Sequence, residues 1–340
     1  MKILYGVQAT GNGHITRART MARELDQAGI EVDYLFSGRP RAELFNMEPF
    51  GDFRCLRGMT FITHRGKIQN FKTLTHNSLL TLIKDIRALD LSPYDLVLTD
   101  YEPVTAWAAR LKGKRAIGVG HQYAFNYAIP VAGENLVTRF IMQSFAPAKH
   151  ALGLHWHHFD SPILPPMIEP GEHAPSVPNK ILVYMAFDDA EHIAAWLRPF
   201  TDHEFYLYCA TPQPRDEGNI HFRPFSRQGF LDDLATSSGV ITNAGFELVS
   251  EAIQSGKKLI VRPVKGQMEQ TSNAKALAQL GYGDVITDDD RETIRRWLAK
   301  PNPQPRPYPN VAKAVVEWIQ SGMTQDEATL ARGLWAQYEF

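Results

Sequence analysis

Three glycines and a histidine end the first apolar run of the chain, within residues 3–18. Gly6, Gly11 and Gly13 let a ligand approach the backbone closely. A helical pattern begins directly after them, and a helix N-terminus is a natural position for an anion. His14 adds an imidazole, which ordinarily titrates near a pKa of about 6.5 and is suited to proton transfer. The stretch therefore predicts an anion-binding loop that carries an acid–base residue.

The same loop lacks the features of both common phosphate-binding motifs. A Walker A loop needs a lysine where the chain has Asn12, and a dinucleotide fingerprint needs a third glycine where it has Thr16. The fingerprint also needs an acid at the end of the second strand, where Ser37 stands. ATP hydrolysis and dinucleotide binding are therefore disfavoured. A tight turn in which His14 caps the helix is the structural alternative.

A second stretch with chemical potential covers residues 239–283. A strand ends there in a turn of small residues that leads into a helix, and such a turn suits a diphosphate. An acid further along the helix could accept hydrogen bonds from the two vicinal hydroxyls of a ribose, although a solvated helix face is the alternative for it. Polar residues after the next strand could bind another hydroxylated group. In this interpretation the turn comprises Asn243, Ala244 and Gly245, the helix acid is Glu251, and the later polar residues are Glu269 and Gln270.

Alternating strand-like and helical patterns must position these loops. Such alternation predicts βαβ units and doubly wound parallel sheets, in which ligands bind beyond the carboxyl ends of the strands. Residues 155–178 interrupt the pattern with six prolines and indicate a semi-rigid linker. We therefore expect an α/β protein with two Rossmann-like domains. The predicted boundaries are 1–160 for the first domain, 161–178 for the linker, 179–322 for the second domain and 323–340 for a terminal amphipathic helix.

Composition limits the class of protein further. The 340 residues suffice for two domains, and 36 basic against 37 acidic side chains leave a net charge of −1, which disfavours nucleic-acid binding. Cys55 and Cys209 form no CxxC pair, which indicates free thiols in a reducing compartment. The amino terminus has too short an apolar run for a signal peptide, and no stretch approaches the ~18 apolar residues of a membrane span. We expect a cytoplasmic protein without a transmembrane segment.

Several histidines are candidates for metal ligands or for residues that contact a substrate. His155, His157 and His158 lie close together, but no further Cys or His follows at a spacing typical of zinc sites, so a hinge or cleft lining is the better interpretation. His121 and Gln122 end a strand and are candidates for contact with a substrate.

Taken together, the motifs resemble those of GT-B glycosyltransferases of the UDP-glycosyltransferase and MurG type. "TNAGFELVSEAIQSGKKLIVRPV" followed by "EQTSNA" resembles their donor-site signature, and "GNGHITRA" resembles the loop after their first strand. With "LVLTDYEP" and "IGVGHQ", the chain is most similar to a bacterial and archaeal set of predicted glycosyltransferases, from residue 1 to about 285. It departs from the pattern at residues 184–192, "YMAFDDAEH", where MurG-like enzymes have a glycine-rich loop.

The resemblance implies two domains that face each other across a cleft, with the helix at 323–340 packed back on the first domain. The second domain would hold a nucleotide sugar, UDP-linked by resemblance, and the first would offer the acceptor to His121 and Gln122. Transfer would be inverting and metal-independent, with no cofactor. His14 would be the base, oriented by Asp100 or Glu102. The further donor contacts would be Gly11, Gly13, Phe225, which would stack on uracil, and Ser226.

The function implied is that of a hexosyltransferase acting on an acceptor hydroxyl, for which a lipid-linked or envelope glycan is one candidate. Such an acceptor would place the cytoplasmic protein at the inner membrane. Two alternatives share the fold. A UDP-sugar 2-epimerase would need more acid–base carboxylates around the sugar, and a non-catalytic nucleotide-sugar sensor would need no His14 and Asp100 pair.

Overall fold

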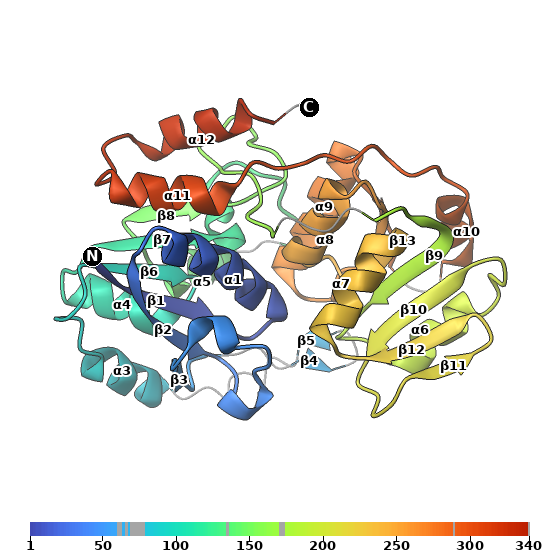
Figure 1. Ribbon diagram of the computed structural model, residues 1–340, viewed down its shortest axis with the longest axis horizontal. Coiled ribbons are helices and arrows are strands. Elements are labelled where there is room, and N and C mark those ends of the chain that lie inside the picture. Colours follow the sequence, from blue (N-terminus) through green and yellow to red (C-terminus); the bar gives the residue numbers. More distant parts are fainter. Residues whose placement is uncertain are drawn as a thin grey trace.

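Two sheets with helices on both faces form the two halves of the molecule, which lie side by side in Figure 1. The computed structural model describes residues 1–59, 63–64, 67–68, 79–133, 136–169, 174–287 and 290–338. The predicted α/β architecture with two Rossmann-like sheets is confirmed.

The first sheet is six-stranded and entirely parallel, in the order β3-β2-β1-β6-β7-β8. Helices cover both faces of this sheet, so its central strands are buried on both sides. The sequences of these strands are accordingly rich in apolar residues. The strands are β1 (Lys2–Gln8), β2 (Glu31–Ser37), β3 (Arg54–Leu56), β6 (Leu96–Asp100), β7 (Ala116–Gly120) and β8 (His150–Gly153).

The helices of the first half begin where the sequence supplies a cap or a turn. Pro103 stands in the first turn of one of them, where its missing N–H costs nothing. A short hairpin of β4 (Thr63–His64) and β5 (Lys67–Ile68) lies apart from the sheet. The helical segments are α1 (Asn12–Gln27), η1 (Arg41–Glu43), η2 (Glu48–Phe50), α3 (Leu79–Ala88), α4 (Pro103–Leu111), η3 (His121–Asn126) and α5 (Leu136–Phe145).

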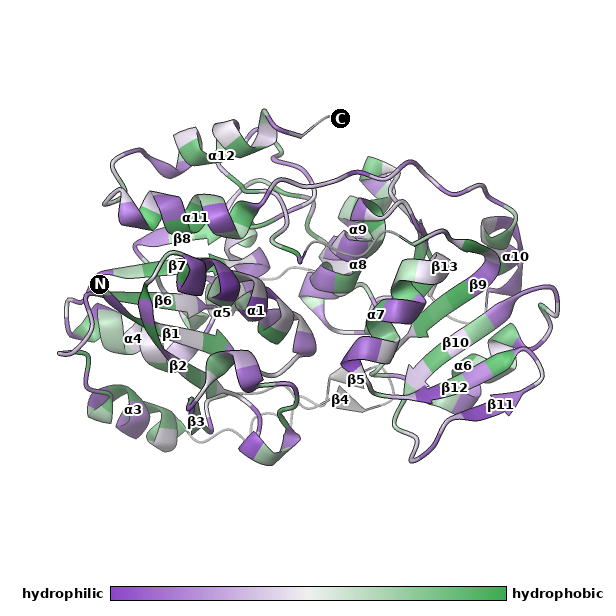
Figure 2. Ribbon diagram, viewed as in Figure 1, coloured by the Kyte–Doolittle hydropathy of each residue, from purple (hydrophilic) through white to green (hydrophobic). Residues whose placement is uncertain are grey.

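The second sheet is seven-stranded, in the order β11-β12-β10-β9-β13-β14-β15, and only β11 runs antiparallel to its neighbour. Figure 2 shows the hydrophobic colour in the second part of β9, where Ile181, Leu182 and Val183 are buried at the centre of this sheet. The strands are β9 (Val177–Tyr184), β10 (Glu204–Cys209), β11 (Arg215–Glu217), β12 (Ile220–Pro224), β13 (Ser237–Thr242), β14 (Lys258–Val261) and β15 (Asp284–Val285). The helices are α6 (Ala190–Leu197), α7 (Arg227–Thr236), α8 (Phe246–Gln254), α9 (Met268–Leu280) and α10 (Arg291–Leu298).

The chain returns to the first half earlier than the sequence analysis placed the return. Residues 301–309, rich in proline, lead from α10 to α11 (Val311–Gln320), which packs on α1, and α12 (Glu327–Trp335) follows (Figure 1). Asn310 donates to Glu24 of α1 at 3.1 Å, and the Trp335 indole donates to the carbonyl of Ile163 at 2.6 Å. The expected boundary at 322 therefore assigned α11 to the second domain, whereas it packs on the first.

Candidate active site

His14 and Asp100 form a hydrogen-bonded pair at the carboxyl edge of the first sheet. His14 stands in the first turn of α1, directly after β1, and Asp100 ends the neighbouring strand β6. Nδ1 of His14 lies 2.7 Å from Oδ1 of Asp100. An ionised carboxylate only accepts, so Nδ1 donates to Asp100 in the tautomer that carries its hydrogen there, and Nε2 then keeps its lone pair. Nη2 of Arg17, which can only donate, also lies 3.0 Å from Nδ1. Nε2 has no hydrogen-bond partner within the described part of the chain.

Arg17, which the sequence analysis missed, fixes Asp100 from one turn further along α1. Its Nη2 donates to Oδ1 at 2.6 Å and its Nε donates to Oδ2 at 2.7 Å, in a two-pronged contact. Burial alone would raise the pKa of Asp100, but Arg17 and His14 outweigh it and hold that pKa below its ordinary value. Asp100 is therefore an ionised partner for the imidazole. The available signal was the spacing of Arg17, three residues after His14, which places both on one helix face.

Glu102, the alternative partner of His14, points elsewhere. Its carboxylate caps α4 by accepting from the backbone N–H groups of Val104 at 2.9 Å and Thr105 at 2.7 Å. The hydroxyls of Ser37 and Thr105 each donate to it at 2.7 Å. Glu102 is fully buried and does not contact His14, so its predicted catalytic role is corrected to a structural one.

The N-termini of α1 and α8 meet between the two halves. Gly11 caps α1 and Gly245 caps α8, and neither helix has a side-chain cap. A Cβ added at either glycine would meet no atom within 4 Å, whereas one at Gly13 would lie 2.8 Å from Cγ of Glu247 in the first turn of α8. Two positive helix ends with uncapped N–H groups therefore converge where the sequence predicts a diphosphate.

The turn before α8 is braced by polar contacts. The Asn243 amide donates to Asp188 at 3.0 Å and to the carbonyl of Arg262 at 3.1 Å, and Asp188 pairs with the Arg262 guanidinium. The carbonyl of the buried Ala244 accepts from Asn273 at 3.0 Å. Asp188 thus braces the turn from the loop between β9 and α6.

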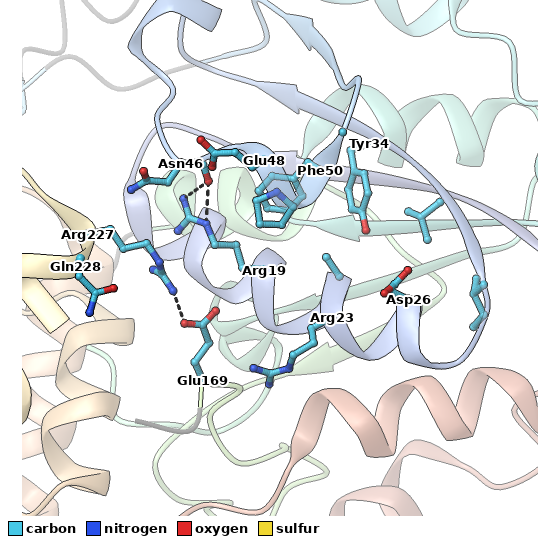
Figure 3. Close-up of a pocket in the computed structure, with 15 residues that line it drawn as sticks. Arg19, Arg23, Asp26, Tyr34, Asn46, Glu48, Phe50, Glu169, Arg227 and Gln228 are labelled. Carbon is cyan, nitrogen blue, oxygen red and sulfur yellow. Dashed lines mark hydrogen bonds and ion pairs between the residues drawn. The ribbon is translucent and has the colours of Figure 1, made fainter. Parts of the chain in front are cut away.

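A hollow of about 850 Å³ lies between the halves, bounded by the outer face of α1, by η2 and by Glu169, Arg227 and Gln228 (Figure 3). Glu169 and Arg227 form an ion pair there. The carboxyl of Glu251 lies close enough to interact with both: burial raises its pKa to about 7, Glu169 adds to the rise and Arg227 opposes it. A carboxyl with a pKa near neutrality therefore lies close to the pair of Glu169 and Arg227, and its contact with a ribose stays a prediction.

Phe225 is the exposed aromatic ring at this edge of the second half, with 47% of its surface exposed. Its ring meets Tyr184 edge-on at a centroid distance of 6.1 Å, and the Tyr184 hydroxyl accepts from Asn12 at 3.4 Å. Ser226 caps α7, its hydroxyl accepting from the N–H of Gly229 at 3.3 Å. Phe225 therefore presents a free face for stacking, while Ser226 has a structural partner.

The predicted acceptor residue His121 is wholly buried between the halves. Its Nδ1 lies 2.9 Å from the carbonyl of Leu154, its Nε2 lies 2.7 Å from Oδ1 of Asn273, and its ring stacks on Phe246 at 4.1 Å. With both nitrogens engaged, it has no atom to offer an acceptor, and its predicted role is corrected to packing at the interface. Burial lowers its pKa, although Glu269 and the contacts with Leu154 and Asn273 oppose that shift.

Of the remaining predicted residues, Gln122 and Glu269 contact each other, and Gln270 holds a loop in place. The Gln122 amide donates to Glu269 across the interface at 3.0 Å, so a predicted acceptor residue and a predicted donor residue meet. Gln270 is buried and accepts from the N–H of Val264 at 2.9 Å, which holds the loop before α9.

No group of three potential metal ligands occurs among the described residues, and no helix within them is long and apolar enough to cross a membrane. His155 is buried and accepts from the N–H of Trp156 at 2.8 Å. The polar stretch from 60 to 78 lies, apart from β4 and β5, outside the described residues.

Comparison with solved structures gives the same architecture over nearly the whole chain. MurG of Acinetobacter baumannii is 15% identical, with 98% of this chain and 94% of that chain covered at a TM-score of 0.52. Arabidopsis thaliana UGT89C1, complexed with UDP, is 13% identical with 94% of each covered at 0.59. The glycosyltransferase VinC, in complex with DTDP, is 14% identical with 97% and 96% covered at 0.57. These likenesses identify the GT-B fold. No curated protein sequence matches the chain significantly.

A family model shows to which protein family the chain belongs. The model described as glycosyl transferase family 1 matches residues 1–301, which is most of the chain. The chain belongs to glycosyl transferase family 1 and is a glycosyltransferase with the GT-B fold.

Proposed function

We propose that this glycosyltransferase moves a sugar from a nucleotide-sugar donor to an acceptor hydroxyl by inverting, metal-independent displacement. The observation that carries the proposal is the His14 and Asp100 pair beside the converging N-termini of α1 and α8. A base and a site for a diphosphate leaving group are the two elements that such a displacement needs.

In the proposed step, Nε2 of His14 takes the proton of the acceptor hydroxyl as its oxygen attacks the anomeric carbon. The bond from that carbon to the diphosphate oxygen breaks, and the electron pair leaves with the nucleoside diphosphate. Asp100 stabilises the imidazolium through Nδ1–H, and Arg17 holds Asp100 in the required orientation.

The charge that develops on the leaving diphosphate would be stabilised by the uncapped N–H groups of the first turns of α1 and α8. Gly11, Gly13 and Gly245 let the phosphates approach the backbone. Two helix ends supply positive charge that needs no metal ion, which supports the metal-independent form of the reaction.

Donor selection would lie in the second half. Glu251 would accept from the ribose hydroxyls, Phe225 would stack on the base, and Glu269 would bind hydroxyls of the transferred sugar. Two of the similar structures are complexes with the pyrimidine nucleotides UDP and DTDP, and we propose UDP for this chain. Asn243 would hold the turn before α8 in place, and Gln270 would hold the loop before α9.

The acceptor would bind on the first half, at the carboxyl edge of the sheet beside His14. For a hexosyltransferase, an acceptor that is lipid-linked or part of an envelope glycan would place the reaction at the cytoplasmic face of the inner membrane.

A thermal-shift screen of UDP-, dTDP- and GDP-sugars, followed by mass analysis of cell extract incubated with the best donor, tests the proposal. A product heavier by one sugar, absent with His14→Ala, is the expected result. Isomerisation of the donor without an acceptor would instead identify an epimerase, and binding without turnover of any kind would identify a sensor.

A further inference from the structure

Glu247 forms an ion pair with Arg17 that joins the two halves of the molecule. It stands in the first turn of α8, in the second half, whereas Arg17 lies on α1 of the first. Both side chains are buried, with 3% of Arg17 and 8% of Glu247 exposed. A buried ion pair keeps its strength because water does not screen it.

Arg17 therefore serves two carboxylates from opposite halves. Its Nη1 contacts Glu247 while its Nε and Nη2 hold Asp100, the partner of His14. The contacts form a continuous chain from His14 through Asp100 and Arg17 to Glu247. A planar guanidinium that is fixed at one edge can present its other nitrogens in only one orientation, so Glu247 restricts the orientation of Arg17 toward Asp100.

Keeping a carboxylate at this position is energetically costly. Burial raises the pKa of Glu247 to about 8; Arg17 opposes this rise, whereas Asp100 and Glu251 add to it, so near neutral pH the side chain contacts Arg17 both with and without its proton. Its Oε2 is buried without a hydrogen-bond partner in the described part of the chain. A buried polar atom without a partner destabilises the folded state, so packing alone does not account for this acid.

The absence of a side chain at Gly13 leaves the space that the side chain of Glu247 occupies. A Cβ at position 13 would lie 2.8 Å from Cγ of Glu247 and 3.5 Å from its Cβ. A larger residue on α1 would therefore push Glu247 away from Arg17. The glycine of the G-N-G-H loop thus has a second consequence besides access of a ligand to the backbone.

We propose that Glu247 is a positioning residue that completes the catalytic base when the halves are together. By holding Arg17 it fixes Asp100 and the imidazole of His14 in working geometry, and when the halves separate the base loses this support. The inference rests on the proposed function of His14 as the base.

Kinetics of variants at position 247 test the proposal. Glu247→Ala should lower kcat about tenfold or more, with the donor KM and the UDP affinity within about twofold of the wild type. Glu247→Gln keeps an oxygen that accepts from Arg17, so its kcat should lie between those of the wild type and Glu247→Ala. Glu292→Ala, which removes an exposed acid on α10, is the matched control and should leave activity unchanged. A wild-type kcat in Glu247→Ala would overturn the proposal.

A double-mutant cycle separates positioning from a general structural effect. If Glu247 acts through Arg17, then Glu247→Ala should cause no further loss in an Arg17→Ala background. Losses that multiply would contradict the proposal.

An NMR measurement makes the test independent of the acceptor. With selectively ¹⁵N-labelled histidine and UDP bound, the Nδ1 proton of His14 should be observed in the wild type and lost in Glu247→Ala. Gly13→Ala should remove the same resonance and serves if the first variant does not fold. A resonance unchanged in these variants would overturn the role of Glu247, whereas full activity of His14→Ala would overturn the proposed function instead.

Discussion

His14 and Asp100 are separated by 86 positions in the sequence, yet Nδ1 and Oδ1 lie 2.7 Å apart. Adjacent parallel strands produce this proximity, because β1 ends just before α1 and β6 ends at Asp100 beside it. Asp100 holds the imidazole through Nδ1, and Nε2 is left for a substrate.

Asp100→Asn should lower turnover by about 10²–10⁴-fold, because it removes the negative charge that stabilises the imidazolium and replaces one carboxylate oxygen by an NH2 group, which cannot accept from Arg17. Steady-state kinetics with the identified acceptor measure the effect, and calorimetry should show UDP affinity unchanged. Asp26→Asn, an exposed change on α1, is the control. Equal turnover in the two variants would exclude Asp100 as the partner of the base.

Glu102→Ala should destabilise the fold and spare the chemistry. It removes the cap of α4 and leaves the donors from Ser37, Val104 and Thr105 unpaired in the interior, which together cost about 2–4 kcal/mol of unfolding free energy. Urea unfolding measures this loss. Below the unfolding temperature kcat should stay within about twofold of the wild type, and a specific loss of turnover in a stable protein would restore a catalytic role.

UDP affinity should depend on pH through Glu251. Burial, with Glu169, raises the pKa of this carboxyl to about 7, so it gains its proton as the pH falls through neutrality. Ribose hydroxyls donate best to the ionised form, so affinity should fall below pH 7, by up to about tenfold per pH unit. Calorimetry from pH 5.5 to 8.5 checks this, and Glu251→Gln should bind more weakly at pH 8 and lose the dependence. A flat wild-type profile would argue against ribose binding at Glu251.

Phe225→Ala should weaken UDP binding by about 1–3 kcal/mol, the usual contribution of a base stacked on an aromatic ring. Since nearly half of the ring is exposed, the melting temperature should hardly change. Leu111→Ala, which removes a side chain that is 65% exposed on α4, is the control for loss of apolar surface. If UDP bound equally well to both variants, the base would have to lie elsewhere.

The sequence was informative where a local pattern determines structure. Alternating apolar runs predicted both sheets, and the small-residue turns predicted the helix N-termini that now meet at Gly13 and Glu247. Glu102 could also have been assigned correctly, because a Glu followed by Pro103 is the pattern of an N-cap before a first-turn proline.

Contacts between the halves could not be predicted from the sequence. Arg17 meets Glu247 across 230 positions, and His121 is buried against Phe246, so both roles depend on how two separately patterned domains dock. The assignment of α11 failed for a similar reason. Residues 301–309 carry the chain back to the first half, but prolines mark a break in helical pattern without indicating where the next helix packs.

The central claim is that His14 is the base, and turnover of His14→Ala tests it most directly. With the identified donor and acceptor, the account predicts a rate lower by about 10²–10⁴-fold, with UDP affinity and melting temperature unchanged. His192→Ala, an exposed histidine on α6, should react at the wild-type rate. Full turnover in His14→Ala would contradict the account.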